Sequence, residues 1–539
     1  MLKHGVDHVL IRDNQLFAYG WGFSPSAVVS KLVLRLLFEK KSAYLEIEAN
    51  YGQRRDDVSK VFANVPEAVN AGFLILADIG DKKIRRAELY WEFQNSPTIR
   101  TAVSLTQIHR QGQVASKIDQ YWLLAKKSFA LLRAAGPRAL INKVQRYRNG
   151  KPITADSAAW KKLTDTLQNE PFSVVVDHDI GGGANTYRHL YIRERLALDE
   201  NVLLFGFHVA SLQYFVEFYQ KQSAARYSIE SIEAFLFLLG NANIQHIMYN
   251  CAVTFRQPLS VVEMLVTLRK HVHCELLVTI HDYFAICPSH FLIDDKGVFC
   301  NVPDLNTCQN CLTAHKDSFV SFSGVRDIGR WRQTWSQLLI AADEVRLFSK
   351  ASETLLKRAY PELDNSNWRL VPHTLHTAMQ KVEILDKEHL HIGVVGVIGK
   401  HKGAQIITEL TKEIIKRQSN VKITIIGSIE AHLPANVVDV TGPYEAKNLP
   451  SFVKNSGANL FLFPSIWAET FSYVAHELVE MNVPFACFDF GAPADLARSY
   501  ERGVVLSSIQ PGLMLDEMEH FWQEKIKPKK AVVWMSTAA

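Results

Sequence analysis

The sequence contains no run of about eighteen apolar residues, and its first stretch, MLKHGVDHVLIRDNQ, lacks the apolar core and cleavage site of a secretory signal. These absences disfavour a membrane-spanning helix and predict a cytoplasmic protein. The seven cysteines are few for 539 residues and odd in number, so a disulfide framework is not expected. The chain also lacks a GxGxxG dinucleotide fingerprint and an evident repeat of about 20 to 50 residues.

The overall charge is small, at +5, but it is unevenly distributed. Residues 105–151 hold ten Lys or Arg and one acid, Asp119, and therefore carry +9, while the remaining residues sum to −4. Apolar residues at 47% and charged residues at 21% are typical of a folded protein, and the length favours about three domains. The basic surplus therefore belongs to one segment.

This basic segment predicts two amphipathic helices between residues 105 and 170. In Tyr121–Arg133 the apolar side chains fall on one helical face and the basic ones on the other, and the pattern resumes after Gly136-Pro137. Such helices fit a membrane surface with anionic lipids. A solvated linker helix packed on a neighbour fits equally well, and nucleic acid is disfavoured because no binding motif accompanies the charge.

Residues 1–104 read as an antiparallel β-sandwich. HVLIRDNQLFAYGW predicts two strands around Asp13-Asn14, and short strands with frequent polar turns continue to about residue 104. Sandwiches of this kind are often sugar-binding or docking modules. Trp21, Tyr51 and Trp91 are candidate exposed aromatics, although a place in the core is as consistent with the pattern.

Residues 171–385 predict an α/β domain with a glycine loop after its first strand. The apolar run SVVV ends at Asp177, and Gly181, Gly182 and Gly183 precede a helical segment. A strand, a glycine loop and a helix allow backbone to approach a ligand closely.

A histidine follows a later strand of the same domain. ELLVTI runs into His281-Asp282-Tyr283, at the carboxyl end of a strand, where open α/β sheets bind their ligands. His281 is therefore a candidate site residue. The alternative is a histidine that caps the strand for structural reasons.

Four cysteines follow within a short loop, with the spacing C-x12-C-x7-C-x2-C: Cys287, Cys300, Cys308 and Cys311. The closing CxxC is half of a common tetrahedral zinc site, and four thiolates would complete a closed, structural site. Free buried thiols are the alternative, because the spacing is not that of a standard zinc ribbon. A catalytic cysteine is not expected.

Residues 386–539 predict a second α/β domain of alternating strands and helices. HIGVVGVIGKHKG is a buried strand with a glycine-rich turn, in which Lys402 precedes Gly403. A lysine there would balance the charge of a diphosphate. VTGPY ends another strand beside an expected base pocket.

The second domain also contains FLFPSIWAETFSYVAHELVE, a buried strand, a loop and a helix expected to begin just after Glu469. Glu477 lies eight residues further along. The amides of Thr470, Phe471 and Ser472 are expected to be unpaired first-turn donors, which suits a phosphate.

The PS-x3-E-T-F-S-Y-x3-E string, the KG pair and FDFGAPAD resemble the donor site of the family four retaining glycosyltransferases of GT-B fold, over roughly residues 172–510. The resemblance implies two Rossmann-like domains facing a cleft. It also implies that Glu469 meets the transferred sugar, Glu477 the ribose and Lys402 the diphosphate. The glycine loop would face the donor phosphates and acceptor, and His281 would touch the sugar. One departure is Val397, which stands where the family usually has an arginine; Lys400 or His401 could replace that cation.

HDYFAICP, the cysteines, KHKGA and FDFGAPAD together resemble the bacterial subset that builds O-antigen or rhamnan polysaccharides. This implies a nucleotide-sugar donor, a polyprenyl-diphosphate-linked glycan acceptor, no catalytic metal, and attachment to the inner face of the cytoplasmic membrane through the basic helices. A GT-B sugar-nucleotide epimerase and a degenerate transferase acting as a glycan-binding or assembly subunit are the alternatives.

Overall fold

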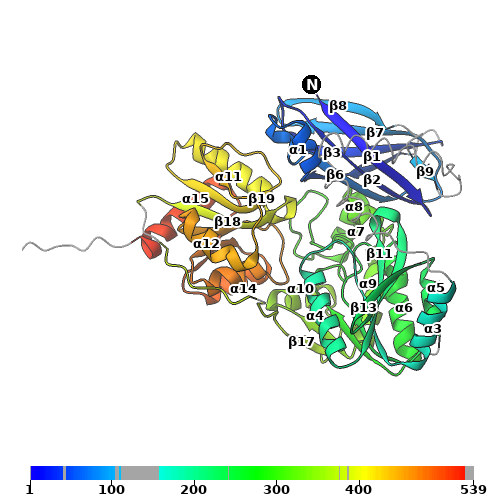
Figure 1. Ribbon diagram of the computed structural model, residues 1–539. Coiled ribbons are helices and arrows are strands. Elements are labelled where there is room, and N and C mark those ends of the chain that lie inside the picture. Colours follow the sequence, from blue (N-terminus) through cyan, green and yellow to red (C-terminus); the bar gives the residue numbers. More distant parts are fainter. Residues whose placement is uncertain are drawn as a thin grey trace, which may run out of the picture. The chain divides into compact units, whose positions relative to one another are not determined.

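A computed structural model describes residues 2–39, 44–103, 108–110, 157–240, 242–375, 377–384 and 388–527. The chain divides into two compact units (Figure 1). The first comprises residues 1–347 and 355–369, and the second comprises residues 348–354 and 370–539. The second unit thus begins before residue 385, where the sequence places the domain boundary, and the four-part division of the chain stays a prediction. The predicted basic helices lie in residues 111–156, outside the described residues.

The N-terminal part of the first unit is the predicted β-sandwich. One sheet has the order β5-β6-β2-β1-β9 and the other β4-β3-β7-β8. Its strands are β1 (Lys3–Arg12), β2 (Gln15–Phe23), β3 (Val29–Phe38), β4 (Tyr44–Glu48), β5 (Asn50–Gln53), β6 (Gly72–Asp78), β7 (Ile84–Phe93), β8 (Ser96–Val103) and β9 (Ile108–Arg110), with α1 (Asp56–Val61) and η1 (Pro66–Ala68) between β5 and β6.

The turn predicted at Asp13-Asn14 joins β1 to β2. Both residues have positive φ, at 46° and 68°, and Arg12 pairs with Gln15 across the hairpin. A two-residue turn of this handedness matches the twist of the flanking strands, which is why Asp and Asn stand there. All neighbouring strands of the two sheets are antiparallel except β1 and β9, which pair in parallel.

The sandwich aromatics belong largely to its interior. Trp91 is fully buried in the core between the sheets, and Trp21 and Tyr51 are half-buried. Tyr51 donates a 2.7 Å hydrogen bond to the Gly22 carbonyl, so its hydroxyl is used within the domain. Of the two alternatives for these aromatics, exposed or core, Trp91 is therefore a core residue.

The sandwich is joined to the first α/β domain by specific contacts. Buried Gln15 donates a 3.1 Å bond from Nε2 to the Arg256 carbonyl, and Ser318 donates a 2.6 Å bond to the Glu48 carbonyl. Lys316 pairs with Glu46 at 2.6 Å. Because these bonds link sequence segments more than 200 residues apart, sandwich and domain form one compact unit.

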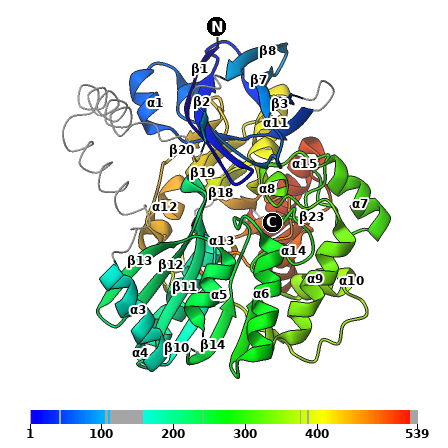
Figure 2. The ribbon, with the colours of Figure 1, turned by 90° about the vertical axis from the view of Figure 1, so that its right-hand side faces the viewer.

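The first α/β domain is built on one sheet of order β13-β12-β11-β10-β14-β15-β16-β17 (Figure 2). Strands β11, β10, β14, β15 and β16 run parallel, and the hairpin β12-β13, which the sequence did not reveal, adds two antiparallel strands at the β11 edge. The strands are β10 (Phe172–Val176), β11 (Asn201–His208), β12 (Gln213–Gln220), β13 (Ser223–Ile229), β14 (Ile244–Tyr249), β15 (Glu275–Thr279), β16 (Glu344–Leu347) and β17 (Trp368–Leu370). The helices are α3 (Ser157–Asn169), α4 (Gly183–Ala197), η3 (Val209–Ser211), α5 (Ile232–Leu239), α6 (Pro258–His271), α7 (Leu305–Ala314), α8 (Ser318–Phe322), α9 (Ile328–Ala341) and α10 (Lys350–Ala359), whose first residues belong to the second unit.

The second unit contains a parallel sheet of order β20-β19-β18-β21-β22-β23. Helices α11 and α15 cover one face and α12 and α14 the other (Figure 1), and each face has its own buried cluster. Strands are β18 (His391–Ile398), β19 (Lys422–Ile429), β20 (Val438–Val440), β21 (Leu460–Phe463), β22 (Phe485–Phe488) and β23 (Gly503–Leu506). Helices are η4 (Lys400–Lys402), α11 (Ala404–Lys416), η5 (Ala446–Asn448), α12 (Leu449–Ser456), α13 (Tyr473–Glu480), α14 (Gly491–Ser499), α15 (Pro511–Phe521) and η6 (Trp522–Ile526).

The predicted β-sandwich followed by two Rossmann-like α/β domains is confirmed. In the part of the chain that the structure describes, no helix combines the length and the apolar character needed to cross a membrane.

Candidate active site

The strand order of the second unit locates its binding edge. Numbered along the chain, the order is 3-2-1-4-5-6, so the connections leave the sheet in opposite directions from β18 and β21. In open α/β sheets, ligands bind at the carboxyl ends of the two strands where this reversal occurs. Lys402 follows β18 and Glu469 follows β21. The two residues singled out from the sequence therefore lie at the same edge of the sheet.

Two glycines brace the loop between Pro464 and Glu469. Gly403, with φ of 86°, lies so close to the Pro464 carbonyl that a Cβ would collide with it. Gly491, with φ of 62°, lies against the backbone of Glu469, and the amide of Ala492 donates to the Glu469 carbonyl at 2.8 Å. The KG pair and the GAPAD string thus position the backbone of Glu469 from two sides.

Glu469 is a buried carboxyl group, with 5% of the residue exposed. Burial raises the pKa of its side chain, and the positive charge of Lys402 and the hydroxyls of Ser465 and Ser472 partly oppose this rise. Its Oε1 atom accepts no well-formed hydrogen bond from any described residue. A buried oxygen without such a partner is costly, and the hydroxyl of a bound ligand would satisfy it.

The helix after Glu469 begins later than predicted. It starts at Tyr473, because the Ser472 hydroxyl accepts a 3.3 Å bond from the Ala475 amide and forms the N-cap. Thr470, Phe471 and Ser472 are therefore loop residues, and the expectation that their amides belong to the first helical turn is wrong. The loop still ends at a helix N-terminus, whose partial positive charge favours an anion.

Glu477 lies within α13, beside Tyr444 from the VTGPY string. Burial raises the pKa of Tyr444 to about 12, and the charge of Glu477 adds to the rise. Burial likewise raises the pKa of Glu477, with a further contribution from Glu480. The structure thus brings together the residues that the sequence assigned to ribose and base.

An aromatic cluster that the sequence interpretation missed surrounds Phe471. The His476 ring stacks on Phe471 at 4.2 Å, and His476 Nδ1 donates a 2.8 Å bond to the Ser472 carbonyl. On the other side, His373 lies 4.9 Å from Phe471 and stacks on Phe348 at 3.9 Å. Histidines at these positions carry no recognisable motif, so only the fold could reveal the cluster.

His401 is disfavoured as the second cation that the sequence interpretation sought beside Lys402. Burial, with a smaller contribution from Lys402, lowers the pKa of His401 to about 4, so its ring is neutral at physiological pH. Val397 is 66% exposed at the end of β18 and offers no polar group. Of the two residues proposed to stand in for the missing arginine, Lys400 alone can carry charge.

Glu430 is a further carboxyl group at this edge, and no motif in the sequence pointed to it. It follows β19 and lies against Gly399, where a Cβ would meet its Oε2 atom at 2.8 Å. Burial raises the pKa of Glu430 to about 7, although the Lys400 amide donates to its carboxylate and opposes the rise. A carboxyl group that titrates near neutrality thus touches the loop that contains Lys402.

In the first α/β domain the corresponding reversal of strand order lies between β10 and β14. The glycine loop follows β10, with Gly181 and Gly182 at φ of 86° and 95° and Gly183 as the first residue of α4. A Cβ on Gly181 or Gly182 would meet no atom within 4 Å, so the glycines are required by backbone conformation and not by crowding.

His281 lies next to this loop. Its Nε2 atom is 2.9 Å from Asn250 Oδ1, and its ring lies edge-on to Tyr187 of α4 at 5.0 Å. Asn250 donates in turn to the Ala184 carbonyl at 2.9 Å. The carboxyl ends of β14 and β15 and the start of α4 thus meet at His281.

Asp177, His178 and Cys251 offer ligand atoms within 4.8 Å of one another, and all three are buried. Asp177 and Asp179 also form a D-x-D motif directly after β10, although the sequence interpretation held that no such motif stands near a strand end. However, Asp177 pairs with buried Arg188 at 2.9 Å, and Asp179 pairs with Arg226 at 2.8 Å. Each carboxylate thus already has a guanidinium partner, and Arg226 is shared between Asp179 and Glu217.

The four predicted zinc ligands lie in one region of the first unit. Cys308 and Cys311 lie on α7, with Cys287 and Cys300 in the loop before it. Burial raises the pKa of the Cys287 thiol to about 12, and the other three thiols add to the rise, so all four lie near one another. All are free thiols, and the described residues include no group of three of these sulfurs within the 4.8 Å separation of a preformed metal site.

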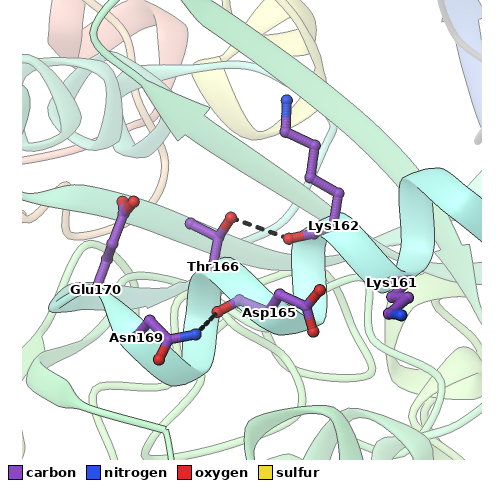
Figure 3. Close-up of a pocket in the computed structure, with 6 residues that line it drawn as sticks. All are labelled: Lys161, Lys162, Asp165, Thr166, Asn169 and Glu170. Carbon is purple, nitrogen blue, oxygen red and sulfur yellow. Dashed lines mark hydrogen bonds between the residues drawn. The ribbon is translucent and has the colours of Figure 1, made fainter.

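A surface hollow of about 440 Å³ lies along α3 (Figure 3). None of the candidate site residues lines it. Two of its polar side chains bond to their own helix: Thr166 donates to the Lys162 carbonyl at 2.9 Å and Asn169 to the Asp165 carbonyl at 2.7 Å. The side chains are Lys161, Lys162, Asp165, Thr166, Asn169 and Glu170. This hollow has no grouping of reactive side chains.

Comparisons with solved structures give similarities of low identity. The lipopolysaccharide outer core galactosyltransferase WaaB in its apo form is 12% identical with a TM-score of 0.40, over 65% of this chain and 90% of that one. The pneumococcal O-GlcNAc transferase GtfA, solved with UDP and GlcNAc, is 10% identical with a TM-score of 0.39, over 66% and 92%. Anabaena Alr3699/HepE, solved with UDP and glucose, is 12% identical with a TM-score of 0.36, over 65% and 89%. No match was found among curated proteins.

A family model matches the second unit. The model described as glycosyl transferases group 1 covers residues 377–532, which include all six strands of the parallel sheet and the loops that carry Lys402, Glu469 and Glu477. Residues 377–532 are therefore similar to the glycosyl transferases group 1 family.

Proposed function

We propose that this protein transfers a sugar from a nucleotide-sugar donor to a growing, lipid-linked bacterial surface glycan of the O-antigen or rhamnan type, with retention of anomeric configuration. The observation that carries the proposal is the buried Glu469 carboxyl group, whose Oε1 atom has no well-formed hydrogen bond among the described residues and which lies near Lys402. The match of residues 377–532 to the group 1 family supports glycosyl transfer as the chemistry.

In this proposal the donor lies at the carboxyl ends of β18 and β21. Lys402 meets the diphosphate, Glu469 a hydroxyl of the transferred sugar, and Glu477 the ribose. Thr470, Phe471 and Ser472 line the loop that leads to α13. The bond from the anomeric carbon to the phosphate breaks, a bond to the acceptor hydroxyl forms, and the proton of that hydroxyl passes to the departing phosphate. Lys402 stabilises the negative charge that develops on the leaving group.

The first α/β domain contributes His281 and the glycine loop of Gly181, Gly182 and Gly183 to the sugar and the acceptor. The basic helices between residues 105 and 170 hold the enzyme at the inner face of the cytoplasmic membrane, beside a polyprenyl-diphosphate-linked acceptor. No catalytic metal takes part in this proposal. The ion pairs Asp177–Arg188 and Asp179–Arg226 support that choice, because each carboxylate already has a guanidinium partner.

A screen of nucleotide sugars by thermal shift tests donor binding directly, because a ligand that binds the folded state alone raises the melting temperature. We expect one or a few nucleotide sugars to stabilise the wild type and to lose this effect with Glu469→Gln and Lys402→Met. Glu445→Gln is a matched control, because Glu445 is 70% exposed. If no nucleotide sugar raises the melting temperature, the proposed function is wrong.

Two other functions are separated by the products formed. Incubation with the stabilising donor and no acceptor would yield an epimeric nucleotide sugar if the protein were a GT-B epimerase. A degenerate transferase serving as a glycan-binding subunit would leave glycan output unchanged when Glu469→Ala and Lys402→Ala variants replace the wild type. Release of the free nucleoside diphosphate only when a glycan acceptor is added supports the transferase.

We also propose a structural zinc ion held by Cys287, Cys300, Cys308 and Cys311. The proximity of four thiols in α7 and the loop before it supports this, and a closed four-cysteine site leaves no open position for catalysis. Elemental analysis of protein purified under reducing conditions should find about one zinc per chain, and the Cys308→Ser/Cys311→Ser variant should lose it. A wild-type preparation without bound metal would rule the site out.

A further inference from the structure

Glu430 lies at the end of β19, next to the turn that carries Lys402. Strands β18 and β19 pair in parallel along their whole length. Directly after β19, the backbone amide of Glu430 donates to the Ile398 carbonyl, the last of β18, at 2.9 Å. Its carboxyl group accepts a hydrogen bond from the Lys400 amide. Glu430 therefore bonds to the chain on both sides of Gly399.

Gly399 leaves room for this carboxyl group and also supports the turn. A Cβ on Gly399 would lie 2.8 Å from Oε2 and 3.4 Å from Oε1 of Glu430, so both oxygens face the glycine backbone. The Gly399 carbonyl accepts from the amides of Lys402 and Ala404, each at 3.1 Å. The turn that presents Lys402 is therefore built on the residue that Glu430 contacts.

The charge of Glu430 is important because of the groups around it. The turn contributes Lys400, His401 and Lys402, and exposed His432 follows on the segment of Glu430 itself. Burial lowers the pKa of His401 to about 4, so its ring is neutral. Burial also raises the pKa of Glu430 to about 7, so this carboxyl group is largely uncharged below that pH. An ionised carboxylate beside the turn would repel an anionic diphosphate, whereas an uncharged carboxyl group does not.

We propose that Glu430 is a positioning residue for Lys402: its uncharged carboxyl group holds the turn at Gly399, so that the donor diphosphate meets the lysine without an opposing charge beside it. The inference rests on the proposed function for the diphosphate, whereas the hold on the turn follows from the contacts of Glu430 alone. Above neutral pH the carboxyl group must take up a proton from solvent when the donor binds. Donor affinity therefore falls as the pH rises.

The test is calorimetric titration of the full-length protein between pH 6 and 8.5 with the nucleotide sugar that gives the largest thermal shift. Glu430→Gln keeps an oxygen for the Lys400 amide and carries no charge. Its affinity should match that of the wild type at pH 6 and exceed it by about tenfold at pH 8.5. At pH 8 the wild type alone should take up roughly half a proton per donor, which buffers of different ionisation enthalpy reveal. Glu430→Ala loses the contact with the turn and should bind weakly at every pH.

Glu409→Gln is a matched control, because Glu409 lies on α11 and pairs with Lys412 on the same helix, and it should leave the pH profile unchanged. Parallel profiles for the wild type and Glu430→Gln would overturn the inference.

A second measurement needs no donor. In protein labelled with ¹⁵N-lysine, the amide signal of Lys400, identified with Lys400→Arg, should shift with a midpoint near pH 7 in the wild type and not in Glu430→Gln. A wild-type signal without this shift would overturn the inference even if a donor binds. If the shift is present but no nucleotide sugar binds, the hold of Glu430 on the turn stands and the proposed function fails.

Discussion

Gly403 lies with its α-carbon against the backbone carbonyl of Pro464, so that the loop after β18 and the loop after β21 touch where no side chain could fit. Gly403 also has a left-handed φ of 86°. This contact keeps Lys402, the preceding residue, beside the segment that leads to Glu469. The glycine of the KG pair is therefore as necessary to the site as the lysine.

The first prediction follows from this contact. Gly403→Ala should lower the free energy of unfolding by about 1 kcal/mol through backbone strain and by a further 1–3 kcal/mol, roughly, through overpacking. Donor affinity should fall at the same time, because the Lys402 backbone must shift. Urea denaturation and donor titration measure the two effects. Gly297→Ala is the control: φ there is 85° and no atom lies within 4 Å of the added Cβ, so it should show the strain cost alone. Equal losses in the two variants would contradict the prediction.

The second prediction concerns the cost of keeping Glu469 buried. Because burial raises the pKa of this carboxyl group above its unfolded value, the folded state binds the proton more tightly, and stability falls as pH rises through the folded pKa. Glu469→Gln removes the charge and keeps the shape. It should therefore raise the melting temperature of the ligand-free protein at neutral pH while lowering kcat by roughly 10²-fold or more. Calorimetry and a transfer assay measure the two effects, and a variant that is both less stable and fully active would refute the assignment.

The sequence predicted most of the fold because apolar runs and turn residues dominate local structure. The hairpin at Asp13-Asn14, the buried strands β18, β19 and β21, and the glycine loop were all identified from pattern alone. The hairpin β12-β13 was missed because a parallel sheet of alternating strands and helices has one strand between two helices. Here three strands, β11, β12 and β13, lie between α4 and α5. The start of α13 was misplaced because Ser472 was interpreted as a helical donor, whereas its hydroxyl makes it the N-cap.

The part of the candidate site that belongs to local sequence motifs was predicted, and the part that depends on distant contacts was not. Glu469, Glu477 and Lys402 belong to recognisable strings, and the fold brings them to one edge. Asn250 and Glu430 belong to no motif. Asn250 contacts a residue distant in sequence, His281. Glu430 has a raised pKa because it is buried. Local sequence patterns reveal neither a distant contact nor the burial of a single side chain.

The third prediction uses the carboxyl group of Glu430. Its folded pKa of about 7 lies above the usual value of 4.5, so the folded state retains a proton that the unfolded state has lost between these values. Stability should therefore fall as pH rises from about 4.5 to 7 and then level off. Glu430→Gln should remove this part of the pH dependence, which a series of denaturation curves between pH 5 and 8 would show. An exposed control, Glu445→Gln, should leave the curve unchanged, and a Glu430→Gln curve parallel to that of the wild type would contradict the assigned pKa.

The last prediction separates the cations near the diphosphate position. Lys402→Met should weaken donor binding by about 10- to 100-fold, since a charge-assisted contact contributes about 1.5–3 kcal/mol. His401→Gln should change affinity by less than about threefold, because burial lowers the pKa of His401 to about 4 and its ring is neutral. Lys400→Gln should give an intermediate loss that shrinks at high salt, because Lys400 is exposed and its charge is screened. Titration of each variant with the donor at two salt concentrations distinguishes these outcomes. A large loss in His401→Gln with an unchanged Lys400→Gln would show that the second cation is the histidine, and that the His401 ring is charged when the donor binds.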